Sequence, residues 1–232
     1  MQSMRYVITG ASRGIGLEFV QQLLRRGDTV DAGVRAPEQA LRLEPFHQVA
    51  GNRLRIHALD VSDPVSVRNF AADVCFEPVD VLINNAGVPG QWVGLHELDY
   101  DDMARTLAVN ALGPLRITAA LLPALRQGTV RKVAYVSSRM GAVSSNTEGG
   151  AYAYRMSKAA LNMGVRSVAL DLRAEGFSCV LLHPGWVQTD MGGPDAPVVP
   201  EVSVRGMLRI IDGLTPEQSG RFFDFEGEEV VW

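Results

Sequence analysis

Cysteine is scarce in this sequence. Only Cys75 and Cys179 occur among 232 residues, and they lie far apart. A disulfide framework and a cysteine-based metal site both require several cysteines at short, regular spacing, so both are excluded. The sequence predicts two reduced, mostly buried thiols in a cytoplasmic protein, and no metal site.

Long apolar runs are also missing. The most apolar stretch, AALLPAL at 119–125, is short and contains Pro123. A membrane-spanning helix needs roughly 20 consecutive apolar residues, so we expect no integral membrane segment. The N-terminal MQSMRYVITGASRG reaches glycine and charge before any apolar run of signal-peptide length, so we expect no secretory signal. These absences predict a soluble, cytoplasmic protein.

Neither sign of charge predominates. The formal net charge is −4 and the pI is near 5.6, which gives no reason to expect nucleic acid or an anionic membrane as a partner. Hydrophobic residues make up 47% and charged residues 21%, the ordinary composition of a globular protein. The length suits one large domain, and no linker or repeat divides the chain, so we expect a single domain over residues 1–232.

What the sequence does contain is a regular alternation of strand-like and helix-like segments. Short runs rich in Val, Ile and Leu predict strands at 5–9, 29–35, 54–60, 79–85, 132–138, 178–184 and 220–226. Helical periodicity lies between them at 15–26, 64–76, 100–126 and 152–175, and more weakly at 37–50 and 202–212. Such alternation is typical of right-handed βαβ crossovers. We therefore expect the α/β class: a Rossmann-type, doubly wound sheet of about seven parallel strands with helices on both faces.

The first strand runs into a glycine-rich turn, TGASRGIG at 9–16. Any tight strand-to-helix turn needs glycine, and the spacing Gly10-x-x-x-Gly14-x-Gly16 differs from the plain G-x-G-x-x-G fingerprint. Its place at the start of an α/β chain is nevertheless the context in which such a turn holds a pyrophosphate against a helix N-terminus. The sequence predicts dinucleotide binding.

The end of the second strand bears on which dinucleotide is bound. NAD sites usually place an acidic residue there for the ribose 2′-hydroxyl, whereas basic residues accommodate the 2′-phosphate of NADP. Here Arg35 follows Val34, and Arg13 is available from the glycine turn. The alternative acidic residue, Asp31, lies too early in the strand. The pattern favours NADP(H) over NAD(H), because arginine binds phosphate through charge-assisted hydrogen bonds.

The segment GGAYAYRMSKAALNM at 149–163 contains two tyrosines and a lysine. On a helix, a spacing of four residues returns to nearly the same face, so Tyr154 and Lys158 lie one above the other. Tyr152 falls on another side. Taken alone, this spacing favours an ordinary surface pair over a reactive tyrosine beside a cation.

Six motifs together resemble the short-chain dehydrogenase/reductase family. They are TGASRGIG (9–16), NNAG (84–87), VNALGP (109–114), VSSRMG (136–141), YRMSK (154–158) and HPGWVQTDM (183–191). Their order and spacing match the family over nearly the whole chain. The resemblance implies a nicotinamide cofactor, a small-molecule carbonyl or alcohol substrate, and a catalytic tetrad of Asn110, Ser138, Tyr154 and Lys158.

The four tetrad residues are chemically suited to this reaction. Tyrosine has an ordinary pKa of about 10, too high for efficient proton exchange near neutrality. A neighbouring lysine ammonium and an oxidised nicotinamide ring would lower the pKa of Tyr154, and Ser138 would bind the same substrate oxygen. The resemblance further implies that Lys158 binds the nicotinamide ribose and that Asn110 holds a water molecule.

The resemblance also implies the cofactor-binding residues. We expect His183, despite its position among them, to be structural. The implied contacts are Gly10, Ser12, Arg13, Gly14, Ile15, Gly16, Arg35, Asp60, Val61, Asn85, Ala86, Gly87, Tyr154, Lys158, Pro184, Gly185, Val187 and Thr189.

The chain departs from the usual family pattern between Ser138 and Tyr154, where SSNTEGG at 144–150 resembles an insertion at the rim of the site. Four apolar residues either line a substrate pocket at this rim or simply pack against the protein: Trp92, Met140, Trp186 and Met191.

The helices predicted at 100–126 and 152–175 carry more apolar residues than one sheet face can cover. In the family these helices pair across a two-fold axis, so we expect a homodimer or homotetramer.

A tighter resemblance, to a developmental cell–cell signalling member of the family, covers the chain from the fourth strand to its C-terminus. It is carried by NTEGGAYAYRMSKAALNM, LLHPGWVQTDMGGPDAP and the last thirty residues. It leaves two alternatives to an ordinary reductase: a signalling or binding protein with little turnover, and a lipid-directed activity at the cell envelope.

Overall fold

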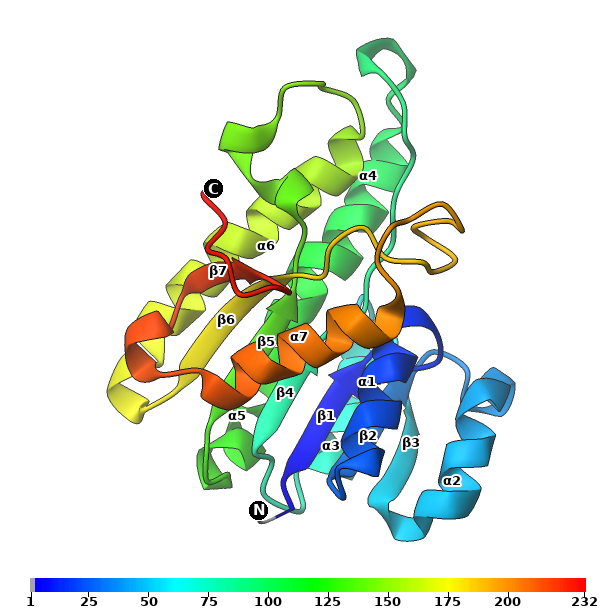
Figure 1. Ribbon diagram of the computed structural model, residues 1–232, viewed down its shortest axis with the longest axis vertical. Coiled ribbons are helices and arrows are strands. Elements are labelled where there is room, and N and C mark those ends of the chain that lie inside the picture. The colour runs from blue at the N-terminus through cyan, green and yellow to red at the C-terminus, as the bar shows by residue number, and fades with distance from the viewer. Residues whose placement is uncertain (1–2) are drawn as a thin grey trace.

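The computed structural model describes residues 3–232, which form a parallel sheet with helices on both faces (Figure 1). The strands lie in the order β3-β2-β1-β4-β5-β6-β7, and every neighbouring pair is parallel. Their bounds are β1 (Arg5–Thr9), β2 (Thr29–Val34), β3 (Leu54–Ala58), β4 (Val81–Asn84), β5 (Lys132–Val136), β6 (Ser178–His183) and β7 (Arg221–Asp224). The winding reverses between β1 and β4, and ligands of such sheets bind outside the strand ends at this point.

The helices form two layers (Figure 1). One layer contains α1 (Gly14–Arg25), α2 (Glu44–Ala50) and α7 (Pro200–Gly213). The other contains α3 (Pro64–Val74), α5 (Gly113–Gln127) and α6 (Tyr152–Asp171), and α4 (Tyr100–Leu107) packs against α6.

Each sheet face supports its own hydrophobic core. Tyr6 and Ile8 of β1 pack beneath α1 and α7, whereas Val7 between them packs beneath α3 and α5. All three side chains are fully buried. Strands covered on both faces need apolar residues at every position, which explains why these strands were recognisable as continuous apolar runs.

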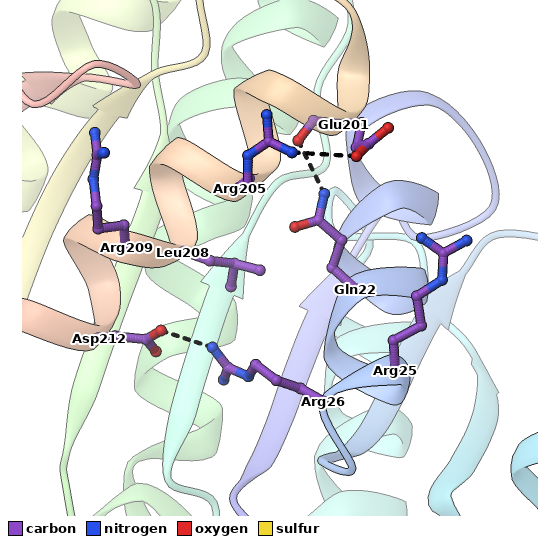
Figure 2. Close-up of a pocket in the computed structure, with 8 residues that line it drawn as sticks. All are labelled: Gln22, Arg25, Arg26, Glu201, Arg205, Leu208, Arg209 and Asp212. Carbon is purple, nitrogen blue, oxygen red and sulfur yellow. Dashed lines mark hydrogen bonds and ion pairs between the residues drawn. The ribbon is translucent and has the colours of Figure 1, made fainter.

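An open groove with a volume of about 560 Å³ lies between α1 and α7 (Figure 2). Two polar contacts join the helices across it: the Gln22 side chain donates to the Glu201 carbonyl at 3.0 Å, and Arg26 lies 2.7 Å from the Asp212 carboxylate. Leu208, which is buried, points into it. The groove lies along the second half of α1, away from the glycine turn that precedes this helix.

Residues Tyr100–Gln127 form one helical stretch in which a π-helical turn, Ala108–Leu112, joins α4 to α5. By length and composition this stretch could cross a membrane, yet 44% of its most apolar window is buried inside the fold. A core helix of an α/β protein has the same properties, so the stretch is weak evidence for a membrane span.

The predicted fold class is confirmed, and the differences lie at the ends of elements. The helix predicted at 152–175 ends at Asp171, and a 3₁₀ turn follows at Arg173–Glu175. The weak helix predicted at 37–50 divides into two 3₁₀ turns and α2. Pro37 and Pro45 each stand in the first turn of a new helical segment, because proline cannot donate the hydrogen bond that would continue the previous one.

Candidate active site

The glycine turn packs tightly at the end of β1. The N–H groups of Gly10 and Ala11 donate to the Gly33 carbonyl in β2 at 2.9 and 3.2 Å. A Cβ atom at position 16 would collide with the Gly10 carbonyl oxygen and would lie 2.6 Å from the Asn85 amide. Glycine at position 16 is therefore required for α1 to begin this close to the strand.

Helix α1 begins without a side-chain cap, as do α2, α5, α6 and α7, whereas α3 and α4 each have one. Asp63 caps α3 and Asp99 caps α4, each through two backbone N–H groups. The corresponding residue of α1 is Arg13, which provides no cap. The first N–H groups of α1 are thus left for another acceptor, and a helix N-terminus favours an anion. The predicted cofactor residues of this turn fit a pyrophosphate: Gly10, Ser12, Gly14, Ile15 and Gly16.

Arg35 lies directly after β2 and is exposed to solvent. Hydrogen bonds from Ser62 lower the pKa of the nearby Asp60 carboxyl, and the charge of Arg35 lowers it further. Asp31 is fully buried within β2, where the Arg5 guanidinium and the His57 ring each lie 2.8 Å from its carboxylate. Asp31 is therefore committed to the interior and cannot serve as the acidic residue at the strand end.

Arg13 has a partner that the sequence did not reveal. Its guanidinium lies 3.3 Å from the carboxylate of Asp190, and both side chains are more than half exposed. Ion pairs between exposed side chains are worth about 0–1 kcal/mol, so this pair leaves Arg13 available for a phosphate.

The NNAG segment after β4 is tied to β1 through Thr9. The Thr9 hydroxyl accepts hydrogen bonds from the N–H groups of Asn85 and Ala86, both at 3.0 Å. A Cβ atom at Gly87 would lie 3.3 Å from Asn110 Oδ1 and 3.8 Å from Lys158 Nζ. The segment expected to line the cofactor site thus lies beside two residues of the expected tetrad.

Asn110 occupies the π-helical turn and is fully buried. Its amide donates to the Val88 carbonyl at 2.8 Å and to Ser157 Oγ at 3.0 Å, while its oxygen accepts from the Val88 N–H at 2.8 Å. Asn110 was expected within a regular helix. The π-helical turn is a feature that occurs frequently at functional sites.

The two serines after β5 have different environments. Ser137 is buried and donates to Asn162 Oδ1 at 2.6 Å. Ser138 accepts from the Met140 N–H at 3.2 Å, and its hydroxyl faces Tyr154 closely enough to lower the pKa of the phenol. Ser137 is thus hydrogen-bonded inside the core, whereas Ser138 lies against Tyr154 of the expected tetrad.

Tyr154 and Lys158 lie side by side on α6, with Lys158 Nζ 5.7 Å from the centre of the tyrosine ring. Burial lowers the pKa of the Lys158 ammonium to about 8. Burial also raises the pKa of the Tyr154 phenol, and the Ser138 hydroxyl opposes this change. The Lys158 ammonium donates to the Val136 carbonyl at 2.9 Å. The lowering of the Tyr154 pKa that we expect from Lys158 and a bound nicotinamide together stays a prediction.

Gly141 is a site residue that the sequence reasoning missed. A Cβ atom there would lie 2.6 Å from the Lys158 Cβ and 2.7 Å from the Lys158 backbone carbon. Its carbonyl accepts from the Asn162 amide at 3.2 Å. Gly141 was visible at the end of the VSSRMG motif, but only its contact with α6 shows why glycine is needed.

The segment after β6 meets the glycine turn. Ser203 donates to the Pro184 carbonyl at 2.6 Å, and Val187 is buried. The Thr189 methyl group lies 3.2 Å from where a Cβ at Gly14 would be. The expected contacts Pro184, Gly185, Val187 and Thr189 therefore belong to a segment that adjoins the start of α1.

Exposed apolar side chains lie on the loops at this edge of the sheet. Trp92 is 65% exposed, Trp186 57% and Met191 51%, so simple core packing does not account for these three. Residues 144–149 of the predicted insertion are exposed, and Ser144 at its start donates to the Val231 carbonyl near the C-terminus at 3.2 Å.

Sequence and structure comparisons place this geometry among known proteins. The family model for short chain dehydrogenase matches residues 5–197. The carbonyl reductase Sniffer of D. melanogaster superposes over all of both chains with a TM-score of 0.94 and 31% identity. An NADPH-bound carbonyl reductase from chicken fatty liver superposes equally well, at 34% identity and full coverage of both chains.

The chain belongs to the short-chain dehydrogenase/reductase family and is an oxidoreductase of that family. It is 37% identical to the 1-hydroxy-2-glutathionyl-2-methyl-3-butene dehydrogenase of Rhodococcus sp., across 97% of this chain and 98% of that protein. It is 69% identical to the C-signal of Myxococcus xanthus over 166 residues, which are 72% of this chain and all of that protein. This confirms the tighter resemblance, which is to the C-factor of fruiting bacteria.

Proposed function

We propose that this chain is an NADP(H)-dependent oxidoreductase that interconverts a carbonyl and an alcohol, acting as one catalytic domain over residues 1–232. The observation that carries the proposal is that the NNAG segment lies between the glycine turn and the expected tetrad. A Cβ atom at Gly10 would lie 2.8 Å from Ala86 Cα, and one at Gly87 would lie 3.8 Å from Lys158 Nζ, which lies beside the Tyr154 ring. A binding protein would have no need to bury a lysine beside a tyrosine at this position.

In the reductive direction, Tyr154 gives its phenolic proton to the carbonyl oxygen, and Ser138 donates a hydrogen bond to the same oxygen. Lys158 stabilises the phenolate that remains, and Asn110 holds Val88 and Ser157 in place around them. NADPH, when bound, supplies the hydride. Residues of the glycine turn, the NNAG segment and the segment after β6 would hold it.

The proposal is tested by following NADPH oxidation with a panel of aldehydes, ketones and quinones. The exposed apolar side chains at the mouth, Trp92, Trp186 and Met191, favour apolar members of that panel. No turnover with any member, under conditions where NADPH raises the melting temperature, would contradict the proposal.

The preference for NADP(H) rests on Arg35, which is exposed at the end of β2, and on Arg13. The NADPH-bound chicken carbonyl reductase and an NADP-bound protein from Burkholderia multivorans, with TM-scores of 0.94 and 0.89, support this choice. The carboxylate of Asp60, whose pKa the charge of Arg35 lowers, accepts hydrogen bonds from the Ser62 N–H and hydroxyl.

We expect Arg35→Met to raise the Kd of NADPH roughly ten- to a hundredfold while the Kd of NADH changes little, because hydrogen bonds between charged groups are worth about 1.5–3 kcal/mol. Isothermal titration calorimetry with both cofactors measures the effect. Arg42→Met, at an exposed position on a nearby 3₁₀ turn, is the matched control. Equal losses for NADPH and NADH would show that Arg35 does not contact the 2′-phosphate.

We also propose that the chain forms a homodimer or homotetramer through the outer face of α5 and α6. Met156, Met163 and Leu170 recur every seven residues on α6, so they lie in one stripe, and each is 47% to 66% exposed. Leu112, the last residue of the π-helical turn before α5, is 49% exposed. A stripe of this kind is typical of a surface covered by a second copy.

Met163→Glu is expected to convert the oligomer into a monomer of 25.2 kDa, because it places a charge in the centre of the apolar stripe. Light scattering after size exclusion, at micromolar concentration, measures the mass. Val49→Glu, at an exposed site on α2 in the opposite helix layer, is the control and is expected to leave the mass unchanged. A wild-type chain that is already monomeric would contradict the proposed assembly.

A second candidate function is intercellular signalling with little turnover, and the 69% identity to the C-signal of Myxococcus xanthus favours it. A complementation experiment distinguishes the two functions. It measures whether a folded, cofactor-binding Lys158→Met variant restores development to a strain that lacks its own C-signal. Rescue equal to that of the wild type would show that signalling does not need catalysis.

We propose a cytoplasmic location for the chain as an enzyme, with envelope association reserved for the signalling role. Cys75 and Cys179 are both free thiols, which is typical of a reducing compartment. Fractionation of cells that express the chain would test this location.

A further inference from the structure

Three charged or titratable side chains meet at the ends of β5, β6 and β7 and have no part in the proposed chemistry. They are Arg139, which directly follows Ser138, His183 at the end of β6, and Asp224 at the end of β7. The Arg139 guanidinium donates to the Asp224 carboxylate at 3.0 Å, and the Arg139 backbone N–H donates to His183 Nδ1 at 3.4 Å.

Asp224 is a fixed anchor for this arginine. It is buried, and its Oδ1 accepts from the backbone N–H groups of Glu226, Gly227 and Glu228 at 3.0–3.1 Å. The turn after β7 therefore orients the carboxylate so that Oδ2 faces Arg139. A charge-assisted hydrogen bond to a carboxylate held in this way restricts where the guanidinium can lie.

His183 is suited to accept the backbone hydrogen bond. The pKa of His183 is lowered to about 4, mainly by burial and also by the charge of Arg139, while the charge of Asp224 opposes this change. The ring is therefore neutral near pH 7, and a neutral imidazole can accept through one nitrogen. His183 thus contacts the backbone of Arg139 while Asp224 holds its side chain.

The backbone that these two contacts hold also positions the Ser138 hydroxyl. Arg139 begins the 3₁₀ turn Arg139–Gly141, whose Met140 N–H donates to Ser138 Oγ at 3.2 Å. The Gly141 N–H donates to the Ser138 carbonyl at 2.8 Å, and the Ser145 hydroxyl donates to the Arg139 carbonyl at 2.9 Å. A shift of Arg139 would therefore move both groups that orient Ser138.

We propose that Arg139, held by Asp224 and His183, is a positioning residue that orients the Ser138 hydroxyl toward Tyr154 and the substrate oxygen. The inference rests on the proposed function, because it concerns the serine of the proposed site. It assigns Arg139 no contact with substrate. An error of about 1 Å in the position of such a group can cost a hundredfold in rate.

The test is a double-mutant cycle of Arg139→Met and Ser138→Ala in the full chain, assayed by NADPH-dependent carbonyl reduction. We expect Arg139→Met alone to lower kcat roughly ten- to a hundredfold, with KM and the Kd of NADPH little changed. When Ser138 has already been replaced by alanine, Arg139→Met should lower kcat little further, because the hydroxyl that Arg139 orients is gone. Arg139→Lys is expected to restore part of the rate.

Arg221→Met is the matched control. Arg221 lies at the start of β7, the end opposite Asp224, and forms a half-exposed ion pair with Glu229. It should leave kcat unchanged. A kcat effect of Arg139→Met that is equally large without Ser138, or that Arg221→Met reproduces, would show a general structural role and overturn the inference.

A second readout does not depend on turnover. The Ser138 hydroxyl opposes the rise that burial causes in the pKa of Tyr154, so Arg139→Met should raise that pKa further in the NADPH complex. Ultraviolet titration, with the spectrum of Tyr154→Phe subtracted, measures it. An unchanged Tyr154 pKa would overturn the inference, whereas a shifted pKa in a protein that reduces no carbonyl would overturn only the proposed function.

Discussion

Tyr154→Phe is expected to lower kcat for NADPH-dependent carbonyl reduction roughly 10²- to 10⁴-fold, the contribution typical of a positioned general acid. The change removes one hydroxyl group and leaves the aromatic ring beside Lys158. Ser138 keeps its contact with the Met140 N–H, and Lys158 keeps its contact with the Val136 carbonyl. The fold and the affinity for NADPH should therefore change little.

The matched control is Tyr152→Phe, which removes the same group two positions earlier on the same helix. Initial rates at saturating NADPH, together with thermal shifts on adding NADPH, separate loss of chemistry from loss of binding. We expect Tyr152→Phe to keep the wild-type rate. Wild-type turnover in Tyr154→Phe, or a comparable loss in Tyr152→Phe, would contradict the assignment of Tyr154 as the proton donor.

The sequence predicted the sheet well because buried parallel strands have an unmistakable pattern. Val7, Leu82 and Leu181 are fully buried on one face, and their sequence neighbours are buried on the other. Such strands are continuous apolar runs, which no surface helix or loop imitates. Helix ends were less accurate, because the 3₁₀ turns after Asp171 and around Pro37 depend on local contacts rather than on periodicity.

The residue types of the candidate site could be found by motif, but their contacts could not. Nothing in the sequence indicates that Arg13 lies 3.3 Å from Asp190, 177 positions away. The π-helical turn around Asn110 inserts no unusual residue, and it is visible only as a change in backbone hydrogen bonding. The rise in the pKa of Tyr154 that burial causes could not be predicted from the sequence, because burial is a property of the fold.

Lys158→Met is expected to lower kcat roughly 10²- to 10³-fold, the effect of removing one group that stabilises charge in the transition state. It should not destabilise the protein at neutral pH. Lys158 is 4% exposed and has no ion pair within residues 3–232. Its ammonium is therefore buried at a cost that methionine, an apolar chain of similar length, does not have. Lost activity with unchanged or increased stability is the expected combination, and urea unfolding with kinetics on the same samples measures both.

The pH dependence of stability identifies the buried ammonium as the cause. The pKa of Lys158 is about 8 in the folded chain and near 10.5 when unfolded. Between these values the unfolded state binds more protons, so the free energy of unfolding of the wild type should rise with pH relative to Lys158→Met. The rise should reach roughly 3 kcal/mol, since one pKa unit corresponds to about 1.4 kcal/mol.

The pKa itself can be measured directly, because the chain contains two lysines, Lys132 and Lys158. Lysine labelled with ¹³C at Cε should give two resonances, and Lys132→Arg assigns them. We expect the Lys158 resonance to titrate near pH 8. Below pH 8 Lys158 carries a positive charge that would stabilise a Tyr154 phenolate. Above pH 8 Lys158 is neutral and the chain is more stable. The protein would therefore be less stable at the pH at which the lysine is best able to support proton transfer. A Lys158 resonance that titrates only above pH 10, or a stability difference that does not change with pH, would contradict this account.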